Sequence, residues 1–205
     1  IRARIKPIIG CEIPFVTKKN NRIDNIVLLC QNINGYYNLN KILSSIHKSR
    51  SSTLGANLEL LEKYNTDLLC LSGARNGLCG ENTLRTPMDV TRDKIKTISR
   101  IFDDRFYIEI DRTNRANESE YNNISLSCAK DLSLPIVASN DVLFINDTDY
   151  EANEVKVSII QKTKLEDRAN QDEYSPDQYF KSQDEMLSLF KDQTSALKNI
   201  SNIIE

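Results

Sequence analysis

Two carboxylates in this sequence stand where a chain of alternating strands and helices places its chemistry. Glu12 follows the apolar run Ile8-Ile9-Gly10, and Asp141 follows the run Pro135-Ile136-Val137-Ala138. Because sites in α/β folds form where buried strands end, both side chains could ligate a hard metal ion. Metal sites for zinc or manganese usually need three or more convergent protein ligands, so two carboxylates without histidines form a weak site.

Other side chains with catalytic chemistry are scarce. The single histidine, His47, lies beside Lys48 on a predicted amphipathic helix, where a solvated role is favoured and no catalytic triad can be assembled. The glycine-rich segment 73–80 fits neither of the common phosphate-binding templates and is interpreted as a strand-to-helix turn. We therefore predict no catalytic residue and no bound cofactor in this chain.

Five short apolar runs of strand length must position the two carboxylates. They are rich in β-branched and aromatic residues, and most lack polar alternation, which is typical of parallel strands buried on both faces. These runs cover residues 8–10, 26–30, 67–71, 106–110 and 135–138. Between them, apolar residues recur with helical spacing. The helical faces are Leu39, Ile42, Leu43 and Ile46; Leu54, Leu58 and Leu61; Ile95, Ile98, Ile101 and Phe102; and Tyr121, Ile124, Cys128 and Leu132. Strands alternating with helices predict an α/β parallel sheet or barrel.

The last third of the chain has a different pattern, with helix starts and no strands between them. Ser175-Pro176-Asp177-Gln178 and Ser182-Gln183-Asp184-Glu185 both read as capping boxes. A final amphipathic helix carries Leu197, Ile200, Ile203 and Ile204, while residues 162–173 are polar and predict an exposed loop. We expect one domain over residues 1–160 and a loop with a helical extension over residues 161–205.

Composition and charge narrow the classes of function. The chain has 27 basic and 29 acidic side chains. It therefore lacks the net positive charge by which a whole chain binds nucleic acid electrostatically. Apolar runs are too short for a membrane span. The five cysteines are widely spaced with no C-x-x-C pair, which favours reduced thiols and a cytoplasmic location. They are Cys11, Cys30, Cys70, Cys79 and Cys128.

Several segments, taken in order, resemble one family. Segment 5–12 (IKPIIGCE) is similar to the third signature of the polymerase-and-histidinol-phosphatase (PHP) domain of bacterial replicative DNA polymerases, the DNA polymerase III alpha subunits. Segment 31–39 (QNINGYYNL) resembles their asparagine-x-x-glycine-tyrosine helix start. Further matches at fitting spacing are 71–73 (LSG), 104–109 (DRFYIE), 134–142 (LPIVASNDV) and 174–182 (YSPDQYFKS), with Glu185-Met186 and Leu189-Phe190. The resemblance covers essentially the whole chain.

The resemblance implies an incomplete, distorted (β/α)7 barrel, in which the first βα units and their metal ligands lie before residue 1. Of the later family ligands, Glu12 and Asp141 match the glutamate and the aspartate. Three positions depart from the pattern: Asn25 and Leu143 stand where the family has histidines, and Ala74 stands where it has a cysteine or histidine. Leucine and alanine cannot ligate, and an amide oxygen is a poor substitute for imidazole. We expect a degenerate site that holds no metal, with Glu12 and Asp141 as vestiges.

The resemblance also implies a role. It indicates a catalytically degenerate scaffold within a DNA-synthesising enzyme, which docks the proofreading exonuclease (epsilon) subunit and assembles with other polymerase III holoenzyme subunits. DNA contact and Mg²⁺-dependent polymerisation are expected of the parent protein, and the extension is expected to lead toward its palm region. No membrane partner is expected. The alternative is a metal-dependent 3′-5′ exonuclease or phosphoesterase of the PHP class.

Overall fold

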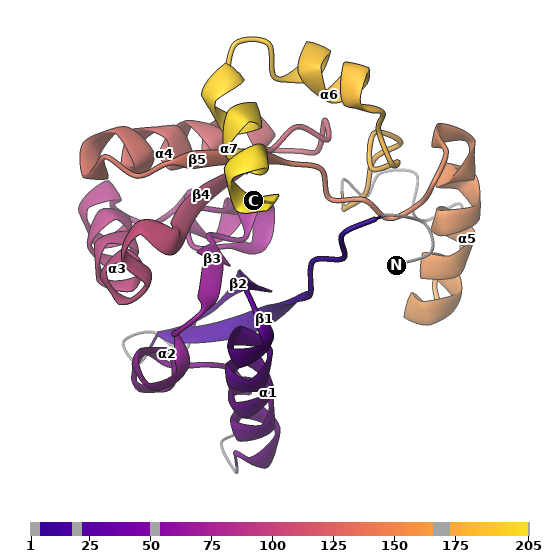
Figure 1. The fold of residues 1–205 in the computed structure, drawn as a ribbon. Helices are drawn as coiled ribbons and strands as arrows, with labels where there is room; N and C mark the ends of the chain where they lie inside the picture. The colour runs from indigo at the N-terminus through magenta and orange to yellow at the C-terminus, as the bar shows by residue number, and fades with distance from the viewer. Residues whose placement is uncertain (1–4, 18–21, 50–53, 166–172, 205) are drawn as a thin grey trace.

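A central sheet carries the described part of the chain, which the computed structural model covers over residues 5–17, 22–49, 54–165 and 173–204. Its strands are β1 (Gly10–Thr17), β2 (Arg22–Cys30), β3 (Leu68–Leu71), β4 (Phe106–Asp111) and β5 (Ile136–Ser139), in that spatial order. The described helices are α1 (Ile33–Lys48), α2 (Leu58–Tyr64), α3 (Met88–Phe102), α4 (Glu118–Leu132), α5 (Tyr150–Gln161), α6 (Gln183–Leu189) and α7 (Thr194–Ile204). The mixed α/β class predicted from the sequence is confirmed (Figure 1).

The sheet is parallel in only one half. β3, β4 and β5 run parallel, whereas β1 pairs antiparallel with β2, and β2 pairs antiparallel with β3. The expectation of a wholly parallel sheet is therefore wrong for its first three strands. For β1 and β2 the reason is the connection: only residues 18–21 separate them, and parallel neighbours need a crossover of a dozen or more residues.

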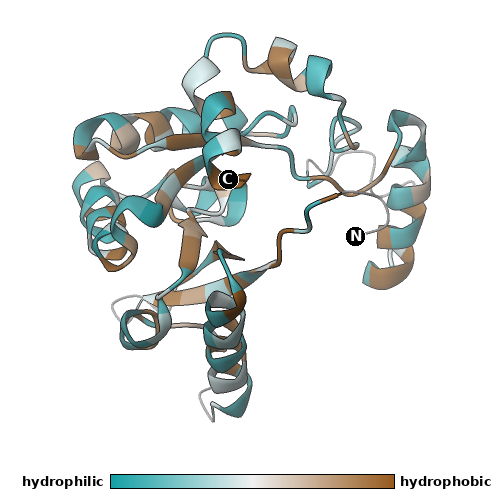
Figure 2. Ribbon diagram, viewed as in Figure 1, coloured by the Kyte–Doolittle hydropathy of each residue, from teal (hydrophilic) through white to brown (hydrophobic). Residues whose placement is uncertain are grey.

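Strand alternation divides the core between two faces. Leu68 and Cys70 of β3 pack with the helical layer of α1, α2, α3 and α4, whereas Leu69 and Leu71 point to the opposite face and belong to the cluster that Ile200 and Ile203 of α7 join. Figure 2 shows β3 as uniformly hydrophobic, as burial on both faces requires. The side-chain amide of Asn199 on α7 also donates to the Ile136 carbonyl of β5 at 2.7 Å.

Two local expectations are corrected. The Ile8-Ile9 run is extended, and the Ile9 carbonyl accepts from the Cys30 amide, but both isoleucine side chains are exposed and β1 itself begins at Gly10. At 44% and 51% exposure, these two side chains do not form a buried strand. Segment 175–178 is also a turn and not a helix start. The capping bonds form, with Gln178 Oε1 accepting from the Ser175 amide at 3.0 Å and Gln178 Nε2 donating to Asp141 at 3.1 Å, but no helix begins there.

The other predicted elements are confirmed with shifted ends. The Ser182 capping box begins α6, with Glu185 bonding back to the Ser182 amide at 2.7 Å. The predicted loop 162–173 is exposed at its described residues, while 166–172 lie outside the described ranges. Within those ranges, no helix combines the length and apolar character needed to span a bilayer.

The start of α1 depends on a glycine. Asn32 caps this helix, its side-chain oxygen accepting from the Asn34 and Gly35 amides. A Cβ on Gly35 would lie 2.1 Å from the Asp67 carbonyl oxygen, which is held by the Gln31 amide at 3.0 Å. Helix and strand therefore approach too closely at this point for any side chain.

Gly35→Ala tests this close approach. Alanine raises helix propensity by about 1 kcal/mol, yet we expect the variant to lose about 1–3 kcal/mol of unfolding free energy because the new Cβ forces α1 away from β3. Urea denaturation measures the change, with the exposed Ser44→Ala on the same helix as control. A variant as stable as the parent would show that the contact relaxes without cost.

Candidate functional site: a polar pocket at the ends of the parallel strands

A polar pocket of about 90 Å³ lies where β3, β4 and β5 end. The carboxyl ends of parallel strands meet at one edge of a sheet, which is where α/β folds place their sites. The pocket is lined by Glu12, Glu109, Asp111, Arg115, Asn140, Asp141 and the turn of residues 73–76. The structure thus brings the two predicted vestigial residues, Glu12 and Asp141, to one place.

A single guanidinium joins the strand ends around this pocket. Arg115 Nη2 lies 2.6 Å from Asp111 Oδ2, and Nη1 lies 2.8 Å from Asp141 Oδ2. Its Nε donates to Thr113 Oγ1 at 2.8 Å. Because Asp111 ends β4 and Asp141 follows β5, this one cation ties two parallel strands together.

Other donors complete the network. The second oxygen of Asp111 accepts from the Tyr121 hydroxyl at 2.8 Å, so this fully buried carboxylate has a partner at each oxygen. Gln178 donates to Asp141 Oδ2 at 3.1 Å, which brings the C-terminal segment to the pocket. Burial raises the pKa of Asp111, and the Arg115 guanidinium opposes that rise.

Glu109 is the second buried acid of β4, two residues before Asp111 and therefore on the same face of the strand. Its Oε2 accepts from the Gly73 amide at 3.2 Å, and Ser139 also bonds to the carboxyl group. Burial raises the pKa of Glu109 to about 7, with smaller contributions from the charges of Asp111 and Glu12. Glu109 therefore changes its charge near neutral pH.

Glu12 differs from its predicted position. It lies within β1 opposite Val27, and not after a strand, with its side chain pointing away from the buried Ile13 and Phe15 face. Asn25 donates to Glu12 Oε1 at 2.6 Å. The residue at a lost histidine position is therefore a hydrogen-bond donor to the vestigial glutamate.

The two remaining lost-ligand positions are placed differently. Ala74 lines the pocket, in the turn that follows Gly73, whose φ of +88° favours glycine. Leu143 does not line it: the residue is part of a bridge to the C-terminal segment, its amide donating to the Gln178 carbonyl at 2.8 Å. His47 is exposed in the last turn of α1, as expected of a solvated residue.

The donor chemistry of the pocket does not fit a transition metal. Among the residues that the structure describes, no three histidine, cysteine, aspartate or glutamate side chains are grouped as ligands of one ion. The space between Asp111 and Asp141 holds a guanidinium, and Glu12 accepts from an amide. The carboxylates of the pocket already face a protein cation and an amide donor. None of the residues that line the pocket supplies an imidazole or thiolate, the ligands that zinc prefers.

Sequence reasoning missed Arg115, Asp111 and the burial of Glu109. A signal was present: Tyr107, Glu109 and Asp111 alternate with isoleucines in the segment FYIEID, so the strand turns acids toward one buried face. Buried carboxylates need a cation or several donors. The arginine four residues beyond Asp111 was the nearest candidate.

Replacing Arg115 tests whether it holds the strand ends. Arg115→Met leaves the buried charge of Asp111 without its cation, so we expect a loss of about 3–5 kcal/mol in unfolding free energy. Adding Asp111→Asn to the same chain should recover part of that loss. Urea denaturation of the four chains of this double-mutant cycle gives the coupling between the two side chains.

Arg92→Met is the matched control, because the Arg92–Asp131 ion pair is exposed, with side-chain exposures of 37% and 39% against 4% and 0% for Arg115 and Asp111. It should cost under about 1 kcal/mol. Equal losses for the two arginine variants would contradict a special role for the buried pair.

The raised pKa of Glu109 predicts a pH dependence of stability. The folded chain holds this proton more tightly than the unfolded chain, so the stabilising contribution is fully present below about pH 4.5 and is lost as pH rises to about 7. Glu109→Gln stays neutral, and we expect it to be more stable than the parent by about 3 kcal/mol at pH 8 and similar to it below pH 4.5. Denaturation across this range measures the difference, with the exposed Glu62→Gln as control. A stability difference that does not change with pH would contradict the raised pKa of Glu109.

Comparison with known proteins agrees with this architecture. The family model of the PHP domain matches residues 1–113. The chain is 32% identical over 201 residues to the DNA polymerase III subunit alpha of Pasteurella multocida (strain Pm70), covering 97% of this chain and 17% of the relative. It is 32% identical over 204 residues to the DNA polymerase III subunit alpha of Escherichia coli (strain K12), covering 98% of this chain and 18% of that relative. It is 34% identical over 204 residues to the DNA polymerase III subunit alpha of Pseudomonas fluorescens, covering 98% of this chain and 17% of that relative. The chain spans about a sixth of the length of these relatives, and it belongs to the PHP domain family.

Proposed function

We propose that this chain is a catalytically degenerate PHP module of a replicative DNA polymerase III alpha subunit, in which it serves as a scaffold. Relatives named DNA polymerase III subunit alpha match nearly its whole length, which supports the replicative setting. In this proposal, DNA synthesis and its Mg²⁺ ions belong to the parent protein. Residues 1–160 correspond to the PHP-type domain and, with neighbouring strands, to a distorted (β/α)7 barrel, while residues 161–205 lead toward the palm region.

The observation that carries the proposal is the cation between Asp111 and Asp141. Carboxylates that converge at strand ends need a positive charge or several donors to offset their burial. Here Arg115 supplies that positive charge from within the protein, at 2.6 and 2.8 Å from the two carboxylates. A guanidinium forms directed bonds to carboxylates but cannot activate a water molecule as a metal does. This arrangement supports a structural role for the pocket.

The scaffold role extends to the segment that follows β5. Gln178 binds Asp141, Ser175 donates to the Thr113 carbonyl, and Arg112 pairs with Asp192 through two bonds of 2.6 and 2.7 Å. These contacts join the end of β4 to residues 175–192. We propose that the surface so ordered docks the proofreading exonuclease (epsilon) subunit and contributes to assembly with other holoenzyme subunits.

A metal-dependent 3′-5′ exonuclease or phosphoesterase is the alternative, and one observation favours it. Glu109 lies in the pocket with a pKa of about 7, the range suited to a general acid or base. The alternative requires a metal that Glu12 and Asp141 would have to hold without histidine.

Elemental analysis with a nuclease assay separates the two functions. The chain is incubated with Mn²⁺ or Zn²⁺, freed of excess ion, and assayed on a 3′-labelled single strand. We expect substoichiometric metal and no 3′-5′ exonuclease activity. The variant Asn25→His/Ala74→His, which adds side chains able to ligate beside Glu12 and in the pocket wall, is the reference for gained metal. Stoichiometric metal with activity in the parent chain would overturn the scaffold proposal.

Co-migration of the chain with the exonuclease subunit of its own organism in size-exclusion chromatography tests docking separately, and separate migration would count against it.

A further inference from the structure

The outer face of α1 and α2 carries cations that have no carboxylate partner among the described residues. α1 contains no acidic residue over its whole length, and its exposed side presents Lys41 and Lys48, seven residues or about 10 Å apart along the axis. α2 adds Lys63 beside them. None of these three lysines takes part in an ion pair between residues that the structure describes.

Five other cations among the described residues differ from these three lysines. Arg75, Arg92, Lys94, Arg112 and Arg115 are each paired with an aspartate or glutamate within 3 Å. Unpaired lysines beside one another repel, so their positive field is directed outward to solvent and to any anion that approaches. The chain as a whole carries a net charge of −2, which makes the cluster a local feature.

An aromatic ring lies at the centre of the cluster. The Lys41 ammonium lies 5.5 Å and the Lys63 ammonium 5.2 Å from the ring centroid of Tyr64. Tyr37 lies one turn before Lys41 on α1 and is 56% exposed, with its ring 6.1 Å from that of Tyr36. Aromatic faces next to phosphate-binding cations are the arrangement by which proteins bind single strands without reading their sequence.

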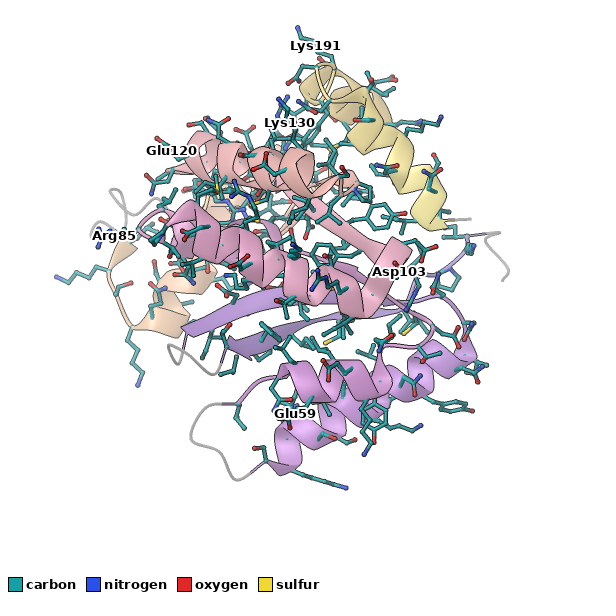
Figure 3. The ribbon with its side chains drawn as sticks, turned by 90° about the vertical axis from the view of Figure 1, so that its left-hand side faces the viewer. Glu59, Arg85, Asp103, Glu120, Lys130 and Lys191 are labelled. Atoms are coloured by element: carbon teal, nitrogen blue, oxygen red, sulfur yellow. The ribbon has the colours of Figure 1, made fainter. Side chains whose placement is uncertain are left out.

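The surface is hollowed at this place. A shallow depression of about 280 Å³ is lined by Asn40, Lys41, Ser44, Ser45, Lys48 and Tyr64. Every one of these side chains can donate a hydrogen bond, and none is a carboxylate. The two acids of α2, Glu59 and Glu62, do not line the depression. Figure 3 shows that α2, marked by Glu59, lies far from α4, marked by Lys130.

We propose that this lysine–tyrosine face, defined by Tyr37, Lys41, Lys48, Lys63 and Tyr64, binds single-stranded nucleic acid. The three lysines contact successive phosphates, the hydroxyl and amide groups of the depression bond to phosphate and sugar oxygens, and Tyr37 stacks on a base. From Tyr37 to Lys48 the face extends about 16 Å along α1, enough for a few nucleotides. A single strand is favoured over an acidic peptide because exposed tyrosine rings offer stacking that carboxylates do not use.

Fluorescence anisotropy of a labelled dodecathymidylate, titrated with the 205-residue chain at several salt concentrations, tests this proposal. We expect a dissociation constant of roughly 1–100 µM at low salt and a slope of log K against log salt of about −2, as three phosphate contacts on a single strand predict. Lys41→Gln/Lys48→Gln/Lys63→Gln should weaken binding roughly tenfold and bring the slope close to zero. Tyr37→Leu should weaken it about fivefold or more with the slope unchanged.

Lys130→Gln/Lys156→Gln/Lys198→Gln is the matched control, with the same charge change on exposed lysines of α4, α5 and α7. It should bind as the parent does, and far-UV circular dichroism should show all variants folded. No binding by the parent at low salt, or equal weakening by both triple variants, would overturn the proposal. Tighter binding of a polyglutamate peptide or of anionic lipid vesicles than of the oligonucleotide would also overturn it, in favour of that other partner.

Discussion

The guanidinium of Arg115 is the interaction on which the far end of this structure depends. Its hydrogen bonds reach Asp111, the last residue of β4, and Asp141, two residues after β5; through Asp141 they reach Gln178, which brings the C-terminal segment back to the sheet. Asp111, which it neutralises, is fully buried and could not remain ionised there alone. An isolated charge inside a protein is destabilising, whereas a buried charge with all its partners fixes their relative positions. Three separate segments are therefore held in register by one side chain.

Such an internal cation has consequences that a bound metal would not have. The occupancy of a metal site varies with ion supply and pH, whereas an arginine stays protonated and is always present. The strength of a buried pair is also conditional, because desolvation offsets most of the Coulomb gain and the pair stabilises only as a complete unit. The pocket is thus better suited to define one arrangement of the strand ends than to add to overall stability. Glu109, beside it, lacks a cation and titrates near neutrality, which shows how local that compensation is.

Periodicity in the sequence predicted most elements, because burial against a helical layer and burial on two faces leave distinct patterns. It predicted β3, β4 and β5 well, and it found the faces of α1, α3 and α4. It failed at Ile8-Ile9, where apolar character alone does not say whether another element lies above, and at Ser175, where a tertiary bond from Gln178 to Asp141 replaces the helix. Strand direction in β1 and β2 also lay outside the reach of periodicity, since only connection length encodes it.

The candidate site was half predicted for a similar reason. Glu12 and Asp141 were found by their positions after apolar runs and then by their resemblance to family ligands, whereas Arg115 has no counterpart among those ligands and was identified only from its distances to Asp111 and Asp141. The lost positions also proved unequal. Asn25 donates to Glu12, Ala74 lies in the pocket wall, and Leu143 belongs to a backbone bridge.

The hydrogen bond from Asn199 to the Ile136 carbonyl can form only after α7 has been synthesised. β5 is paired on one side by β4, and on its other side a helix supplies a hydrogen bond that a neighbouring strand would otherwise make. The two residues are 63 positions apart. A ribosome that adds 5–20 residues each second therefore leaves this carbonyl without that partner for roughly 3 to 13 seconds. During that interval the newborn sheet presents an open edge, the feature through which strands of different chains pair. Protection of the nascent chain from its neighbours thus depends on a helix that is synthesised well after the strand it covers.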